Sequence, residues 1–383
     1  MHQQPPNDPK APDFINARAA LAACPVSAIR TLTKGEISHQ NKVNKMKNEN
    51  GSNYSILPTL RPEEEEISKA YGILNQPLPF PRPLSDNVWL LGHHSSKTFG
   101  AFPYLVQGYH KKQFISIMVD VPKFTPSAIR AVSSLLPPAP LEEGEEGKKE
   151  LDYLFLTHVD DTAQHNDWKN EYPNLKRIFH SGDLGSHNWI GDETLEDVEI
   201  LLDSDSKVDT ILDKEDLVFY SLDGERFSID FEKDRSDSDE GYDSILKDFM
   251  EKMDTDFLIL HTPGHSPGSI SLLYHSRSAD RKDNHDGGTI FTGDTYAFST
   301  RDGGHMTGFP RYGNDLERQA QTLKCLGELS NLYECVASGH GHVRDYRFFR
   351  GDMNDEKVSE LKKRDIHDAV AEALEFSGRS VTR

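Results

Sequence analysis

The feature that most restricts the fold of this chain is an apolar segment that ends abruptly in histidine and aspartate. Leu154, Phe155 and Leu156 are followed by Thr157 and then, within eight residues, by His158, Asp160, Asp161 and His165. A short apolar run of this kind is typical of a buried strand, and imidazole and carboxylate groups are common metal ligands. The segment therefore predicts a strand that ends at a metal site.

Three later fragments also combine a turn or a strand end with histidine or aspartate. They read HTPGHSPGS at 261–269, TIFTGDT at 289–295 and ASGHGH at 337–342. Glycines such as Gly264 and Gly268 allow a tight loop in which the backbone approaches a metal closely. The candidate ligands in these fragments are His265, Asp294 and His340, and the flanking His261 and His342 are expected to support them.

The four fragments, in this order, resemble the metallo-β-lactamase fold of metal-dependent hydrolases, including its glyoxalase II branch. The resemblance spans about residues 84–350. It implies an α/β architecture, a four-layer αββα sandwich of two sheets with helices outside. Residues 1–75 are polar and are expected to form an irregular, mostly disordered N-terminal extension. Residues 351–383 are expected to form a C-terminal helical segment.

The first motif departs from the family pattern, His-x-His-x-Asp-His, and two alignments remain open. Asp160 stands in place of the second histidine, and the final Asp-His pair is out of register. An insertion of two residues aligns Gln164 and His165 with that pair and leaves Asp161 as an alternative carboxylate. The resemblance implies one metal held by His158, Asp160, His265 and Asp294, and a second held by Asp294, His340 and His165.

Hydrophobic periodicity predicts the main elements. Strands are predicted at 87–92, 102–107, 114–120, 257–261, 270–274 and 289–292. Helices are predicted at 125–136, 161–168, 316–326 and 354–376. In the second of these helices Asp161 and His165 would share one face, because they are four residues apart.

The resemblance implies a hydrolase that uses a metal-bound hydroxide on an ester, a thioester or a related small molecule. Asp160 or Asp161 would orient or deprotonate the water, and Asp294 completes the expected catalytic set. Arg311 and Tyr312, in a loop over the sheet edge, are candidate substrate-binding residues. One or two divalent ions are expected. Zinc is the first expectation, and the carboxylate of Asp160 makes iron or manganese an alternative.

Two other functions stay open. His158, His265 and Asp294 form the two-histidine, one-carboxylate set of a mononuclear iron enzyme, which would make the protein a sulfur-dioxygenase-like oxidoreductase. Alternatively, the protein is a degenerate, non-catalytic binding protein on the same fold. Bound iron with oxygen uptake would distinguish the first alternative, and weak metal retention would distinguish the second.

The net charge of −20 restricts the partners. An acidic chain without a basic stripe argues against binding to nucleic-acid phosphates. No apolar run approaches the roughly 20 residues that span a bilayer, so no membrane partner is expected. The expected partner is a small-molecule substrate, and the sequence leaves the oligomeric state open.

The three cysteines are too scattered for a zinc ribbon and favour a reducing compartment. Cys24-Pro25 resembles the end of a ferredoxin cluster motif, but the other cysteines of such a motif are missing. No Fe–S cluster is therefore expected, because such a cluster needs four thiolates. Without an apolar segment near Met1, a cytoplasmic location is expected, or an organelle if a targeting segment lies outside this chain.

Overall fold

The fold is seen in a computed structural model, which describes residues 80–137, 149–203, 217–229, 242–277, 287–299, 304–350 and 353–380. The expected N-terminal extension at 1–75, with Cys24, lies outside the described residues. Its predicted disorder and the predicted domain boundaries therefore stay predictions.

The first sheet has seven strands, which lie side by side in the order in which they occur in the chain. Neighbours from β1 to β4 are antiparallel, and neighbours from β4 to β7 are parallel. The predicted strands at 87–92, 102–107 and 114–120 are confirmed as β2, β3 and β4. The strands are β1 (Arg82–Ser85), β2 (Val88–Leu90), β3 (Tyr104–His110), β4 (Gln113–Val119), β5 (Tyr153–Phe155), β6 (Lys176–His180) and β7 (Ile200–Leu202).

The second sheet has the strand order β16-β15-β12-β11-β10-β8-β9. β12 and β15 are parallel, and the other neighbours are antiparallel. The predicted strands at 257–261, 270–274 and 289–292 are confirmed as β10, β11 and β12. The strands are β8 (Leu217–Tyr220), β9 (Arg226–Ile229), β10 (Phe257–His261), β11 (Ile270–Tyr274), β12 (Gly288–Gly293), β15 (Tyr333–Ser338) and β16 (Arg344–Asp345), and a separate small sheet pairs β13 (Ala297–Ser299) with β14 (His305–Thr307).

The α-helices of the described residues are α4 (Pro126–Leu135), α5 (His165–Glu171), α7 (Tyr242–Lys252), α8 (Leu316–Glu328) and α9 (Asp355–Ser380). The predicted helices at 125–136, 316–326 and 354–376 are confirmed. α4 begins where the Thr125 hydroxyl accepts a hydrogen bond from Ala128 N at 3.2 Å, a favourable cap for the first turn. Within the described residues, no helix has the length and apolarity needed to cross a bilayer.

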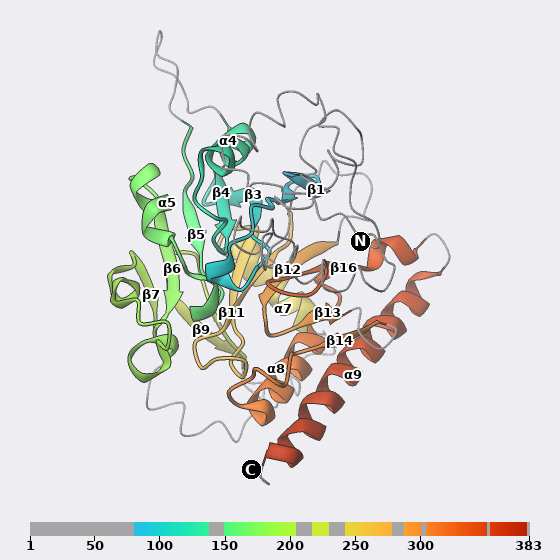
Figure 1. Cartoon of the computed structure of the whole chain (residues 1–383). Coiled ribbons are helices and arrows are strands. Elements are labelled where there is room, and N and C mark those ends of the chain that lie inside the picture. Colours follow the sequence, from blue (N-terminus) through green and yellow to red (C-terminus); the bar gives the residue numbers. More distant parts are fainter. Residues whose placement is uncertain are drawn as a thin grey trace, which may run out of the picture.

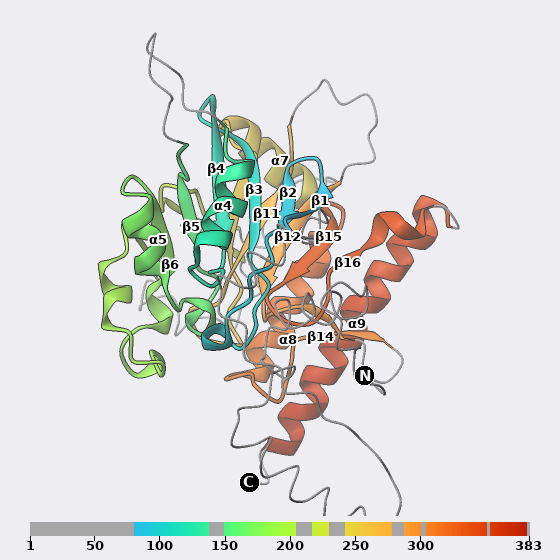
Figure 2. The same cartoon turned by 45° about the horizontal axis from the view of Figure 1, so that its top comes forward.

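Three hydrophobic cores separate four layers. On β4, Ile117 lies in the core between the two sheets, whereas Met118 faces the core formed with α4 and α5. On β10, Ile259 faces the other sheet, whereas Leu258 faces the core formed with α7, α8 and α9. Successive side chains of a strand point to opposite faces, so each sheet is buried on both sides. The predicted αββα sandwich is confirmed, with α4 and α5 on one outer face and α8 and α9 on the other (Figures 1 and 2).

The prediction of one helix over 161–168 is wrong at its start. Asp161 ends a 3-10 turn, η3 (Val159–Asp161), and α5 begins only at His165. Gln164 between them has a φ of 74°, in the left-handed region, which interrupts a helix. Its side-chain Oε1 accepts a hydrogen bond from Phe124 N at 3.2 Å. Asp161 and His165 therefore do not share a helix face.

Candidate metal centre

The candidate ligands are carried by loops that follow strand ends in both sheets. These loops follow β5, β10, β12 and β15, and they carry His158, His265, Asp294 and His340, respectively. Backbone hydrogen bonds connect the His158 region with the His265 region, and the Asp294 region with the His340 region. Ile270 N donates to Thr157 O at 2.9 Å, and Gly339 N donates to Gly293 O at 2.8 Å. Ligands from distant parts of the chain are thus brought to one place.

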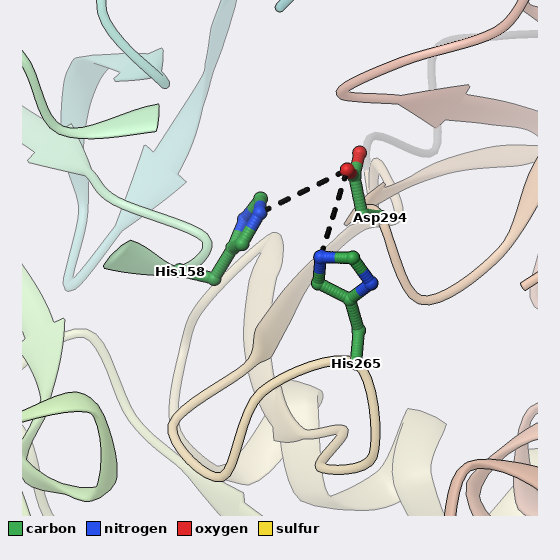
Figure 3. Close-up of side chains that lie close together, drawn as sticks. All are labelled: His158, His265 and Asp294. Carbon is green, nitrogen blue, oxygen red and sulfur yellow. Dashed lines mark ion pairs between the residues drawn. The ribbon is translucent and has the colours of Figure 1, made fainter. Parts of the chain in front are cut away.

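His158, His265 and Asp294 form the first group that could hold a metal ion (Figure 3). Oδ2 of Asp294 lies 3.9 Å from His158 Nε2 and 3.7 Å from His265 Nε2. Oδ2 of Asp160 borders the same space, 3.7 Å from His158 Nε2 and 3.9 Å from His265 Nε2. Two atoms bonded to one zinc ion lie at most about 4 Å apart, because each bond is about 2.0–2.2 Å. His158, His265 and Asp294 therefore fit one ion, and Asp160 lies beside it.

A buried chain of hydrogen bonds orients the ring of His158. The Thr157 hydroxyl donates to Asp120 Oδ1 at 2.9 Å. The oxygen of the same hydroxyl lies 3.0 Å from His158 Nδ1, so the ring nitrogen donates to it. A proton on Nδ1 leaves the Nε2 lone pair for a metal, which is how a neighbouring acceptor fixes the tautomer of a ligand histidine.

Asp161, Asp294 and His340 form a second group that could hold a metal ion. His340 Nδ1 lies 2.8 and 3.0 Å from the two carboxylate oxygens of Asp294. Asp161 is fully buried, and neither of its oxygens has a hydrogen-bond partner among the described residues. A buried carboxylate without a donor is costly, and a bound cation would remove that cost. Asp294 borders both groups, so the residues fit two ions with Asp294 between them.

Electrostatics at the site also suit a cation. Burial lowers the pKa of His340, but the carboxylates of Asp294 and Asp161 outweigh burial and raise that pKa to about 10. Burial raises the pKa of Asp160, but His158 and His265 outweigh it and lower that pKa to about 2. Burial raises the pKa of Asp161 well above its usual range. A metal-free site of this kind holds protons at neutral pH that a metal ion can replace.

The loop before His265 depends on close backbone packing. Gly264 has a φ of 136°, and a Cβ there would lie 2.4 Å from Cα of Gln319 in α8. Glycine is the residue that adopts this conformation without steric cost. Asn314 N closes the other side of the loop by donating to His265 O at 2.9 Å.

Asp183, which the sequence patterns did not single out, holds two metal loops together. Its Oδ1 accepts a hydrogen bond from Gly268 N at 2.6 Å, and its Oδ2 accepts from the Ser266 hydroxyl at 2.7 Å. The same Oδ2 accepts from Val159 N at 3.0 Å, in the loop that carries His158. In the sequence, Asp183 is marked only by a Ser-Gly-Asp turn that follows a strand.

His165 lies outside both groups. Its Nδ1 accepts from Arg177 Nη1 at 3.0 Å, because a guanidinium can only donate. Its Nε2 lies 3.3 Å from Asp192 Oδ2 and 3.2 Å from Thr194 Oγ1. Both ring nitrogens therefore have partners away from the other candidate ligands. The arrangement does not support the alignment that counts His165 as a ligand, and Asp161 lies beside Asp294 and His340 instead.

The ligand loops border a cavity of about 810 Å³. Of the two predicted substrate-binding residues, Tyr312 lines this cavity and Arg311 does not. Phe99, Trp189 and Phe309 also line it, and the sequence patterns did not indicate them. They lie far apart in the chain and share no local motif, so only the fold brings them together.

Comparison with solved structures finds metallo-beta-lactamases. The DIM-1 metallo-beta-lactamase is 12% identical, with 75% of this chain and 95% of that chain covered and a TM-score of 0.40. GOB-18 from Elizabethkingia meningoseptica is 13% identical, with 85% and 99% covered and a TM-score of 0.37. FIM-1 from Pseudomonas aeruginosa, in its mono-zinc form, is 12% identical, with 75% and 94% covered and a TM-score of 0.38. No family model and no curated protein matches this chain. Likeness at this level assigns no role to any residue, so the roles proposed below rest on the geometry of this chain.

Proposed function

We propose that the protein is a metal-dependent hydrolase. The observation that carries the proposal is the convergence of His158, His265 and Asp294, beside the buried Asp161, whose oxygens accept no hydrogen bond among the described residues, at a cavity that His265 and Asp294 line. A catalytic metal site needs ligands held by the protein and one side open to substrate. The four-fragment motif supports the same class of reaction.

His158, Asp160, His265 and Asp294 would hold the first ion, and Asp161, Asp294 and His340 would hold a second. When bound, a divalent ion lowers the pKa of water and polarises a carbonyl or phosphoryl oxygen. Zinc suits the imidazole nitrogens, whereas iron or manganese would suit the added carboxylates.

Asp160 is the residue proposed to orient the attacking water. Its carboxylate is ionised at neutral pH, because His158 and His265 outweigh burial and lower its pKa to about 2. It also lines the cavity, where a substrate can approach. Esters and thioesters are the proposed substrates. Water adds to the carbonyl carbon, the bond to the leaving oxygen or sulfur breaks, and the leaving group takes up the proton.

Metal analysis of protein purified without added metal tests this proposal. We expect two ions per chain in the parent, loss of both in Asp294→Ala and loss of one in Asp161→Ala. His165→Ala is the matched control, because its ring contacts Arg177 and Asp192 instead, and it should retain both ions. A parent that holds no zinc, iron or manganese as purified, and retains none when these ions are then added, would refute the proposal in favour of a non-catalytic binding protein.

A mononuclear iron oxidoreductase is the second candidate. It is favoured by one observation, that the first group consists of two histidines and one carboxylate, the ligand set of non-haem iron oxygenases. One iron per chain, unaffected by Asp161→Ala, together with oxygen consumption on a persulfide, would favour this candidate over the hydrolase.

A further inference from the structure

Three aromatic side chains stand exposed on the wall of the cavity. Phe99, Trp189 and Tyr312 are 50%, 59% and 71% exposed, and all three line the cavity. The ring centroids of Phe99 and Trp189 lie 5.9 Å apart, within the range of an aromatic pair. Rings left in water forgo the stabilisation of burial. Several of them at one cavity are typical of a surface that a ligand covers.

Tyr312 has a fixed position relative to the first metal group. Its backbone N donates to Phe309 O at 2.9 Å, which closes a tight turn. Two residues later, Asn314 N donates to His265 O at 2.9 Å and lies 3.0 Å from Gly264 O. The loop that carries the tyrosine is therefore joined directly to the loop that carries a candidate ligand.

Phe99 and Trp189 are held in a similar way. Three residues after Phe99, Phe102 N donates to Gly339 O at 2.7 Å, immediately before His340. Trp189 follows two consecutive 3-10 turns, η4 (Ser181–Asp183) and η5 (Gly185–His187). The first of these turns contains Asp183, which accepts hydrogen bonds from Ser266 and Gly268 in the loop that carries His265. A surface that is held in place before binding loses less entropy when a ligand covers it.

The described cavity wall has no lysine or arginine that could pair with a negatively charged substituent. Among the described residues that line it there is no lysine or arginine, and Asp160 and Asp294 contribute carboxylates. An anionic group remote from the reacting bond would lie against the rings of Phe99, Trp189 and Tyr312, where no lysine or arginine of the described wall replaces the water that it loses. A volume of about 810 Å³ lies in the range of small-molecule sites.

We propose that the substrate is an ester or thioester that is uncharged outside its reacting group, with an aryl or medium-length alkyl acyl chain. This chain lies across Phe99, Trp189 and Tyr312, while the carbonyl carbon lies near Asp160 and Asp294. The inference rests on the proposed hydrolase function and adds the substrate class to it.

A panel of S-ethyl thioesters tests the inference on the metal-loaded protein. The acyl groups are acetyl, hexanoyl, 4-phenylbutanoyl and adipoyl, the last with a free carboxylate at its far end. We expect kcat/KM for hexanoyl to exceed that for adipoyl by about tenfold or more, because the far carboxylate loses water at the rings without gaining a cationic partner. A higher or equal value for adipoyl would overturn the inference.

Two variants locate the acyl chain. Trp189→Ala and Tyr312→Ala should each lower kcat/KM for 4-phenylbutanoyl by about tenfold, since each removes one apolar surface from contact with the chain. The acetyl substrate does not reach the rings and should change by less than about twofold. Phe348→Ala is the control, because Phe348 is 78% exposed but is not part of the cavity wall. Equal losses on the acetyl and 4-phenylbutanoyl substrates would contradict the placement.

Binding of 4-phenylbutanamide, which is uncharged and is not a thioester, separates this inference from the proposed function. Calorimetry should show a Kd about tenfold weaker in Trp189→Ala and in Tyr312→Ala than in Phe348→Ala, for the same reason of lost apolar contact. If no thioester is hydrolysed but this difference is seen, the proposed function fails and the aromatic binding surface stands. An unchanged Kd in both aromatic variants would refute the surface itself.

Discussion

Asp183 Oδ2 accepts a hydrogen bond from the Ser266 hydroxyl at 2.7 Å, and both side chains are buried. The same carboxylate also accepts from Gly268 N and Val159 N. One side chain therefore sets the separation between the loop that carries His158 and the loop that carries His265. The position of the first metal group depends on a residue that is not itself a candidate ligand.

Asp183→Asn should weaken metal binding without removing a ligand. The amide keeps one acceptor oxygen but brings an NH2 group towards backbone donors, so at least one buried donor loses its partner, at a cost of about 1–3 kcal/mol. Loss of supporting hydrogen bonds around a metal site commonly lowers metal affinity by about 10–100-fold. Competition with a chelator measures the affinity. Asp203→Asn is the control, because the side chain of exposed Asp203 accepts a hydrogen bond from Ser181, in the same 3-10 turn as Asp183, and none from the metal loops among the described residues. Equal affinities in the two variants would argue against this role.

Gly264→Ala should destabilise the protein strongly. The new Cβ would lie 2.4 Å from Cα of Gln319, and the φ of 136° is strained for alanine. Steric overlap together with this strain is expected to cost about 2–4 kcal/mol of unfolding free energy. Urea unfolding of the metal-free protein measures the change. Gly378→Ala, in α9 with open space around it, should be neutral or slightly stabilising. Similar midpoints for the two variants would contradict the packing argument.

The sequence was most informative where the signal was local. The apolar runs of β4 and of the segment before His158 predicted buried strands, because a strand that is covered on both faces has consecutive apolar residues. The fragments that end in His265, Asp294 and His340 predicted which loops carry candidate ligands. The structure places these three loops beside the first motif.

The parts that the sequence missed depend on contacts between distant residues. α5 starts late because Gln164 adopts a left-handed conformation and bonds Phe124, 40 residues away. Asp183 acquires its role from a loop 83 residues further along the chain. The pairing of Phe99 with Trp189 likewise has no local pattern. Periodicity reports the burial of a residue but not its partner, so it could not predict that Asp161 lies beside Asp294 and His340 while His165 contacts Arg177.

The carboxylate of Glu199 predicts how the stability of the folded protein changes at acidic pH. Burial raises its pKa, but hydrogen bonds from Arg177 and Lys169 outweigh burial and lower it from 4.5 to about 2. A carboxylate with a depressed pKa in the folded state stabilises the fold above its unfolded pKa and loses that contribution as the pH falls. The contribution should therefore disappear between about pH 4.5 and pH 2.

Glu199→Gln should make the loss of stability over this pH window shallower and should lower stability slightly near neutral pH. The Glu199 side chain is 28% exposed and solvent screens its ion pairs in part, so the effect at neutral pH should be at most about 1 kcal/mol. Urea unfolding at pH 6 and pH 3 measures both changes. Glu196→Gln, at an exposed position in η6 (Glu193–Asp197), is the control. A profile for Glu199→Gln that parallels the parent would show that the ion pair with Arg177 does not contribute.

Loading of the second metal group should release a proton from His340. In the metal-free protein burial lowers the pKa of this histidine, but Asp294 and Asp161 raise it to about 10, so the ring is protonated at neutral pH. A metal ligand must be deprotonated, and the apparent affinity for one ion should therefore rise about tenfold per pH unit between pH 6 and pH 9. Calorimetric titration with zinc in PIPES and in Tris, whose ionisation enthalpies differ, counts the protons released.

The variant His340→Gln should release about one proton fewer than the parent. His187→Gln is the control and should match the parent, because His187 lines the cavity but belongs to neither group. The same proton count in His340→Gln and the parent would show that His340 does not exchange a proton for the ion.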